Sequence, residues 1–271
     1  MRVFAIGFWA IVGAAVGSCI NVVAHRLPRG ISLWWPPSRC PGCLTPLGPL
    51  ENVPVLGWLG LGGKCRHCRM AIPVRYPLVE LGTAGLFGVL AWHFQAGFTL
   101  TSLVEVACWG FFAAVLLALS LIDLDTLELP GELTAAGIVG GLVFRTFFPV
   151  WASGAWASGP PGLVDALYGL LVGIGLFDVI SYVGEKAMGK EAMGGGDATL
   201  AALIGVWLGW KLLLVSLAFG FGLGAVFGLA GIAAGRLKRE EPLPFGPFLA
   251  LGALGGLLFG ESWITSYMTL F

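Results

Sequence analysis

The sequence predicts an all-α polytopic membrane protein with about eight transmembrane helices and a cytoplasmic zinc-binding loop domain between the first two helices. Of its 271 residues, 57% are hydrophobic and only 11% are charged, and the mean hydropathy is +0.89. This composition departs far from that of soluble domains, so a soluble enzyme is excluded. Charge-free runs close to the ~20 residues that cross a bilayer predict the spans, and two cysteine pairs predict the loop domain.

The predicted spans follow one another along the chain. Four long runs lie at 3–24, 81–104, 212–235 and 242–260, and weaker runs lie at 106–122, 133–144, 166–177 and 198–210. We expect residues 1–24 to form a first transmembrane helix, residues 25–76 a cytoplasmic four-cysteine zinc domain, and residues 77–271 a seven-helix membrane domain. The lipid bilayer is therefore a predicted partner.

Basic residues predict the orientation of these spans. Eight spans place twelve of the 15 basic residues on one side of the membrane, and basic residues that flank spans stay in the cytoplasm. The loops at 25–76, 123–132, 184–197 and 236–241 are therefore expected in the cytoplasm, with both termini outside. The net charge is +0, so nothing suggests a nucleic-acid partner.

Four cysteines in the first loop have the spacing of a zinc site. Cys40 and Cys43 form one C-x2-C pair, Cys65 and Cys68 form a second, and 21 residues separate the pairs. Such pairs deliver four thiolates to a tetrahedral Zn²⁺, which supplies folding energy that a loop with few apolar residues lacks. Four cysteines leave no open position, so the zinc is expected to be structural.

The sequence leaves other roles open for the cysteines. Disulfides are disfavoured in a reducing cytoplasm, and His67 lies inside the second pair, where it could replace one cysteine. Cys19 and Cys108 lie inside apolar runs, where a cysteine usually behaves as a small hydrophobic residue.

Two aspartates stand at the cytoplasmic ends of predicted spans. Asp123 follows the run 106–122. Asp197 follows Gly194, Gly195 and Gly196, and three consecutive glycines allow an extended peptide to approach the main chain. Two carboxylates brought together share one proton, so that the ionised group activates water while the protonated group donates to a carbonyl. These two residues are therefore candidates for an aspartic-peptidase dyad.

The residues alone leave other interpretations open. Asp197 could cap a helix, while Asp123 and Asp125 could be solvated helix ends. Asp165 and Asp178 flank another apolar run, where they could make polar contacts between helices or line the ion path of a polytopic transporter.

At this point the chain resembles the bacterial type IV prepilin peptidase family of bifunctional leader peptidases and N-methyltransferases. The resemblance spans nearly the whole chain. Asp123 stands ahead of Pro130 and Asp197 ends a GxGD box, as in the two aspartate motifs of that family. The other matching stretches are Gly17-Ser18-Cys19-Ile20-Asn21-Val22, Arg26-Leu27-Pro28, Glu51-Asn52-Val53-Pro54 and Arg75-Tyr76-Pro77-Leu78-Val79-Glu80.

The resemblance implies a reaction, its partners and a cellular location. Asp123 and Asp197 would cleave the leaders of prepilins and pseudopilins at the cytoplasmic edge of the bacterial inner membrane, with Gly194, Gly195 and Gly196 positioning the substrate. The cytoplasmic domain would methylate the new N-terminus with S-adenosylmethionine, with Glu51 and Asn52 as candidate residues. A peptidase without methylation is the alternative.

Two residues depart from the family pattern. Gly131 follows Pro130 where the family usually has aspartate, and Thr199 stands where lysine usually follows the GxGD box. Neither change replaces a carboxylate of the dyad, so both bear on substrate positioning rather than on cleavage.

Overall fold

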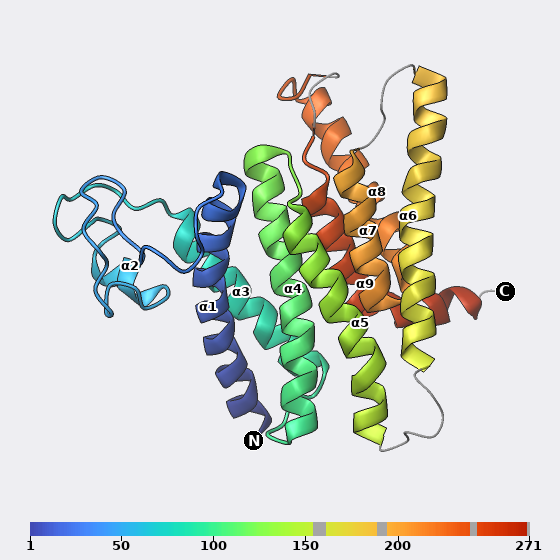
Figure 1. Cartoon of the computed structure of the whole chain (residues 1–271), viewed down its shortest axis with the longest axis horizontal. Coiled ribbons are helices and arrows are strands. Elements are labelled where there is room, and N and C mark those ends of the chain that lie inside the picture. Colours follow the sequence, from blue (N-terminus) through green and yellow to red (C-terminus); the bar gives the residue numbers. More distant parts are fainter. Residues whose placement is uncertain (154–160, 189–193, 239–242, 270–271) are drawn as a thin grey trace. The chain divides into compact units, whose positions relative to one another are not determined.

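The computed structural model describes residues 1–153, 161–188, 194–238 and 243–269. These residues are helical apart from turns, loops and two isolated β-bridges, which confirms the predicted all-α fold (Figure 1). The helices are α1 (Arg2–Arg26), η1 (Leu27–Arg29), α2 (Leu56–Gly60), α3 (Arg75–His93), α4 (Leu100–Thr126), α5 (Gly131–Ser153), α6 (Pro161–Met188), α7 (Gly195–Leu208), α8 (Trp210–Ala233) and α9 (Gly246–Met268).

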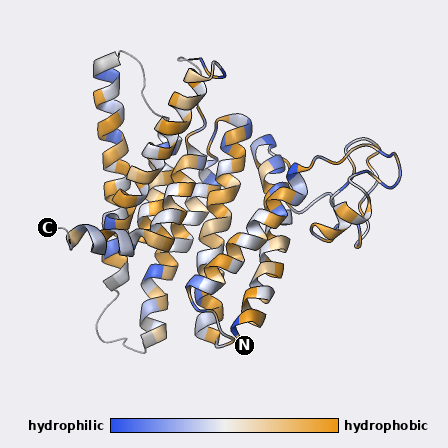
Figure 2. Ribbon diagram, turned by 180° about the vertical axis from the view of Figure 1, so that it is seen from behind, coloured by the Kyte–Doolittle hydropathy of each residue, from blue (hydrophilic) through white to orange (hydrophobic). Residues whose placement is uncertain are grey.

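Five of these helices are long and apolar enough to cross a membrane by length and composition. They are the segments Arg2–Arg29, Leu100–Thr126, Gly162–Lys186, Trp210–Ala233 and Gly246–Met268. Hydrophobic residues dominate the helices, whereas the loop between α1 and α3 is mixed (Figure 2). Each predicted run overlaps a helix in the described part of the chain, but α7 has only 14 residues.

One predicted span has the wrong boundaries. The run 81–104 was expected to be continuous, yet α3 ends at His93 and α4 begins at Leu100. Gln95 has a φ of 51°, and the Ala96 N–H donates to the Ala91 carbonyl at 2.7 Å, which closes the end of α3. Local hydrogen bonding therefore interrupts a stretch that hydropathy alone treats as one span.

The chain divides into two compact units, Met1–Ala114 and Val115–Phe271. In the first unit, α1 packs against α3. A Cβ on Gly17 would lie 2.8 Å from Cα of Glu80 and 2.9 Å from Oγ1 of Thr83, so glycine permits the two helices to approach closely. Ala5, Trp9 and Phe87 belong to the core beside this contact.

The second unit is built around α7. This helix packs against α5, α6, α8 and α9, and its residues from Leu200 to Leu208 are all buried. A Cβ on Gly169 or Gly205 would overlap the main chain of the other residue, so α6 and α7 meet backbone to backbone. Other helices therefore enclose α7 from Leu200 onward, whereas residues 195–199 of its first turn are exposed or half-buried.

Candidate active site and metal centre

The cysteine loop is built from two turns with the same hydrogen bonds. In the first turn, the Leu44 N–H donates to the Cys40 carbonyl at 2.9 Å and the Cys40 N–H donates to the Thr45 carbonyl at 3.0 Å. The second turn repeats this pattern, with Arg69 donating to Cys65 at 3.0 Å and Cys65 donating to Met70 at 2.8 Å.

The likeness of the two turns extends to their backbone. Leu44 and Arg69, each four residues after the first cysteine of a turn, have φ values of 58° and 61°. Isolated bridges pair Arg39 with Pro46 and Lys64 with Ala71. The loop therefore presents two equivalent knuckles, each offering a pair of thiols to one point.

The geometry of the four sulfurs fits a zinc ion. All four Sγ atoms lie within 4.8 Å of one another, with 3.6 Å between Cys40 and Cys68 and 3.9 Å between Cys43 and Cys65. Four sulfurs bound tetrahedrally at ~2.3 Å from Zn²⁺ are about 3.8 Å apart, whereas a disulfide requires about 2.05 Å. The predicted cluster of four cysteines is confirmed, and the disulfide alternative does not fit these distances.

The surroundings of the thiols act in different directions. Hydrogen bonds with the Thr45 side chain and main chain lower the pKa of the Cys43 thiol to about 6, and main-chain hydrogen bonds of Cys68 and His67 lower the pKa of Cys65. A main-chain hydrogen bond of Met70 lowers the pKa of Cys68, but burial and hydrogen bonds with the other three cysteines together raise this pKa to about 11. Thiolate is the form that binds metal. His67 is exposed and does not belong to the cluster, and neither do Cys19 and Cys108.

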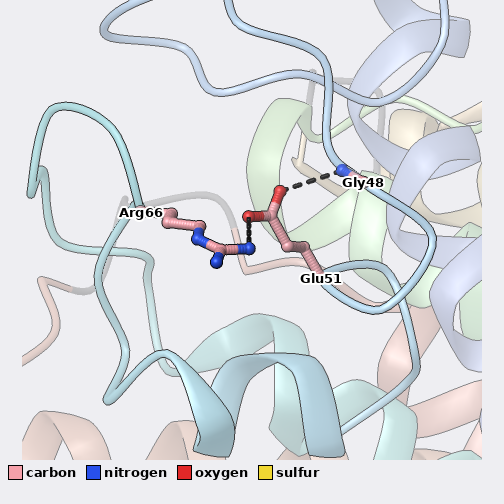
Figure 3. Close-up of polar contacts among 3 residues, drawn as sticks. All are labelled: Gly48, Glu51 and Arg66. Carbon is pink, nitrogen blue, oxygen red and sulfur yellow. Dashed lines mark hydrogen bonds and ion pairs between the residues drawn. The ribbon is translucent and has the colours of Figure 1, made fainter.

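Glu51 contributes contacts within the same loop (Figure 3). Its Oε2 accepts the Gly48 N–H at 2.9 Å, and its Oε1 lies 3.8 Å from Nη1 of Arg66, in the second knuckle. Both carboxylate oxygens are thus engaged by the loop, while Asn52 is exposed. These contacts hold the loop together, and no step of methyl transfer is derived from them.

A further anchor of the loop was missed by sequence reasoning. Glu80 on α3 is only 8% exposed, and its Oε2 accepts the Val55 N–H at 2.6 Å. Val55 has a φ of 62°, so this bond stabilises an unfavourable backbone conformation just before α2. The run of residues ending in Glu80 gave no sign of this partner, because the donor is a main-chain group.

The second unit places Asp123 in an enclosed position. Asp123 lies in the last turn of α4 and is 6% exposed, whereas Asp125 is exposed. Oδ2 of Asp123 accepts the N–H of Gly246 at 2.7 Å, and Gly246 is the first residue of α9. The two aspartates thus differ in exposure, and Asp123 is not a solvated helix end.

Asp197 lies in the first turn of α7, outside the five candidate spans. The pKa of Asp197 is raised to about 6, mainly by burial and to a smaller extent by the charge of Asp123. The two carboxyl groups are therefore close enough to repel each other when both are ionised. The N-cap of α7 is Gly194, with no side-chain capping hydrogen bond, so the capping interpretation of Asp197 is wrong.

A second contact ties the two aspartate segments together. A Cβ on Gly196 would lie 3.1 Å from Cβ of Leu129, in the linker that follows Asp123. Added Cβ atoms on Gly194 and Gly195 would meet no atom of the described residues within 4 Å. Within this part of the chain, close packing therefore explains only one of the three glycines.

Of the two departures from the family pattern, only Thr199 has a local contact that accounts for it. A Cβ on Gly131 would meet nothing within 4 Å, so this exposed position does not depend on glycine. The Thr199 hydroxyl donates to the Gly196 carbonyl at 2.8 Å, which satisfies a carbonyl in the first turn of α7.

The remaining acidic candidates differ from each other. Asp165 forms an ion pair with Arg145 of α5, which is the polar contact between helices that its position suggested. Asp178 is exposed on α6. A paired Asp165 weakens the interpretation of these residues as an ion path.

Comparison with known proteins agrees with this arrangement of sites. Residues 11–94, which include the four cysteines, match the bacterial peptidase A24 N-terminal domain, and residues 110–229, which include both aspartates, match the type IV leader peptidase family. A prepilin leader peptidase/N-methyltransferase of Stutzerimonas stutzeri is 35% identical, over 95% of this chain and 92% of its own length. The chain belongs to the type IV leader peptidase family.

Other members of the family are similarly close. Proteins of the same name from Pseudomonas aeruginosa and Burkholderia pseudomallei are 36% and 38% identical, over 95% and 94% of this chain and 91% and 85% of their own lengths. No solved structure matches the chain. Its apolar helices and its membership of this family indicate an inner-membrane protein.

Proposed function

We propose that this chain is a membrane aspartic endopeptidase that removes the leader peptides of type IV prepilins and pseudopilins, with Asp123 and Asp197 as its catalytic pair. The observation that carries the proposal is the enclosed Asp123 carboxyl group, whose charge contributes to the raised pKa of Asp197. Two carboxyl groups so placed ionise one after the other, so there is a range of pH in which they share one proton, as aspartic peptidases require.

The reaction needs no group beyond these carboxyls and water. The ionised carboxylate takes a proton from water while the water oxygen bonds to the scissile carbonyl carbon, and the protonated partner gives its proton to the carbonyl oxygen. The C–N bond then breaks as the nitrogen receives the first proton, and a hydroxyl proton of the diol returns to the partner. One water is consumed, and the pair returns to its singly protonated state.

The proposed topology places this chemistry at the cytoplasmic edge of the membrane. We assign eight spans, with α3, α5 and α7 joining the five longer candidates, and both termini outside. The end of α4 and the start of α7 then share the cytoplasmic side, where twelve of the basic residues also fall. In this assignment residues 1–24 are the first span, 25–76 the cytoplasmic domain and 77–271 the peptidase domain.

The glycine triplet is the proposed approach for the substrate. Gly194 has an extended backbone, with φ −74° and ψ 148°, and no described residue lies within 4 Å of a Cβ added to Gly194 or Gly195. An extended prepilin segment can therefore lie along this main chain within reach of Asp197.

The cysteine cluster is proposed to hold one structural Zn²⁺ through Cys40, Cys43, Cys65 and Cys68. A closed set of four thiolates supplies folding energy to the loop rather than a reactive position. Methylation of the new N-terminus with S-adenosylmethionine is supported by the names of the relatives. Glu51 and Asn52 remain its proposed residues, and their contacts provide no independent support.

The function is tested by incubating the purified protein with a prepilin, with and without S-adenosylmethionine, and measuring the intact mass of the product. We expect loss of the leader under both conditions, and a further gain of one methyl group only when S-adenosylmethionine is present. Cleavage without that gain would leave the peptidase proposal standing and remove the methyltransferase proposal. An unchanged prepilin mass would contradict both proposals.

A further inference from the structure

The hydrogen bond between Asp123 and Gly246 joins residues 123 positions apart in the chain. Gly246 is buried at the start of α9, whose N-cap, Phe245, makes no side-chain capping bond. The next residue, Pro247, has no N–H, and the Phe248 N–H donates to the Phe245 carbonyl at 3.1 Å. The Asp123 carboxylate therefore accepts the first main-chain donor of α9, which would otherwise be buried without a partner.

The close approach requires glycine at position 246. A Cβ there would lie 2.9 Å from Oδ2 of Asp123 and 3.3 Å from its Cβ and Cγ. The first of these distances is shorter than an ordinary carbon to oxygen contact, so any side chain would push the carboxylate out of place. A residue without a side chain thus brings a main-chain donor directly against a catalytic group.

The contact also favours one charge state of Asp123. The N-terminus of a helix carries partial positive charge, and a hydrogen bond to a carboxylate oxygen stabilises the ionised form. Both carboxyl groups are at least partly buried, which favours their neutral forms. They differ in that Asp123 accepts a main-chain hydrogen bond from Gly246, whereas α7 has no side-chain capping bond from Asp197.

On the basis of the proposed peptidase function, we propose that the main-chain N–H of Gly246 is a positioning group that holds Asp123 as the ionised member of the pair. With Oδ2 held by Gly246, Oδ1 of Asp123 is the oxygen that takes the proton from water. Asp197 then carries the shared proton and donates it to the scissile carbonyl oxygen.

Two changes at position 246 test this role. Gly246→Ala adds the crowding Cβ, and cell-free incorporation of glycolic acid at this position replaces the N–H with an ester oxygen and adds no volume. We expect kcat to fall about 100-fold in the alanine variant, by analogy with other small displacements of catalytic groups, and about 10-fold in the ester, with KM changed less than about twofold.

The pH profile of cleavage separates positioning from a loss of folded protein. A smaller folded fraction lowers the rate equally at every pH, whereas loss of the donor makes the Asp123 carboxylate harder to form. The acidic limb of the profile should therefore move to higher pH in the ester form. The carboxyl groups that follow Asp123 in the chain, Asp125, Glu128 and Glu132, and the carboxyl group of Asp197 in α7 are the same in both forms.

The matched control is Gly255→Ala in the same helix, where the nearest atom to an added Cβ is 3.6 Å away. This control should cleave like the unmodified protein. An ester form with an unshifted profile and normal kcat would overturn the role of Gly246 while the unmodified protein still cleaves. Absence of cleavage by the unmodified protein would instead overturn the peptidase function itself. If the alanine variant does not fold, the ester form alone decides between these outcomes.

Discussion

The cysteine loop and the carboxylate pair are assembled in opposite ways. The cysteines lie within 28 residues of one another, in two turns whose hydrogen bonds are completed within each turn. The carboxylate pair consists of Asp123 from α4 and Asp197 from α7, and Asp123 accepts a hydrogen bond from Gly246 of α9. A metal site in a loop can thus be specified by local spacing, whereas the catalytic pair depends on how buried helices pack.

The largest expected effect separates the two regions by removing the metal. Cys65→Ser removes one of the four thiolates, so the zinc content should fall from about one ion per chain to nearly none. Residues 30–74 should become sensitive to protease, while the helices of the second unit keep their thermal unfolding temperature. Metal analysis and limited proteolysis in detergent measure both effects.

Cys19→Ser is the control for this change, because Cys19 lies on α1 and outside the cluster. It should keep its zinc. Zinc retained in full by Cys65→Ser would show that the four cysteines are not the ligands.

A second, intermediate effect concerns the charge of Asp197. Folding raises the pKa of this carboxyl from 3.8 to about 6, first through burial and then through the charge of Asp123. Between these values the folded chain binds more protons than the unfolded chain, so stability falls as pH rises from about 4 to 6 and stays lower above. Asp197→Asn removes this loss, so its advantage in unfolding temperature should grow over that range and then level off.

The same measurement in an Asp123→Asn background tests the contact between the carboxyls. Without the charge of Asp123, the advantage of Asp197→Asn should be smaller. An advantage that does not depend on pH would contradict the raised pKa of Asp197. An advantage that is unchanged in the Asp123→Asn background would show that the two carboxyl groups do not interact.

The smallest effect compares the two glutamates that hold the cysteine loop. Glu80→Gln weakens a buried hydrogen bond to the Val55 N–H, at a cost of about 1–2 kcal/mol, so exchange of the Val55 amide should accelerate roughly 5 to 30-fold. Arg66→Ala removes the 3.8 Å ion pair between Arg66 and Glu51, in which the arginine side chain is 73% exposed. This change should lower the stability of the loop by less than about 1 kcal/mol. Equal amide exchange in both variants would contradict this ranking.

The sequence was sufficient for features that depend on local pattern. Hydropathy located a helix at every predicted run within the described residues, and the spacing of Cys40, Cys43, Cys65 and Cys68 predicted their cluster. The choice of Asp123 over Asp125 followed from the family resemblance, and burial of Asp123 agrees with that choice.

Features that depend on main-chain groups could not be predicted in this way. The turn at Gln95 interrupts an apolar run through backbone hydrogen bonds, to which hydropathy is insensitive. Gly246 and Val55 each act through an N–H that every residue except proline carries, so their residue types give no signal. Only the packing of α9 against the end of α4 brings the Gly246 donor to Asp123.

Cleavage of a prepilin by Asp123→Asn, Asp197→Asn and Asp125→Asn tests the central claim most directly. Asparagine at position 123 still offers an oxygen to the Gly246 N–H, so a purely structural aspartate there would be replaced without loss of activity. The account predicts that the cleavage rate falls about 100-fold to 10,000-fold in Asp123→Asn and in Asp197→Asn. Asp125→Asn should cleave at the normal rate. Normal cleavage by either Asp123→Asn or Asp197→Asn would contradict it.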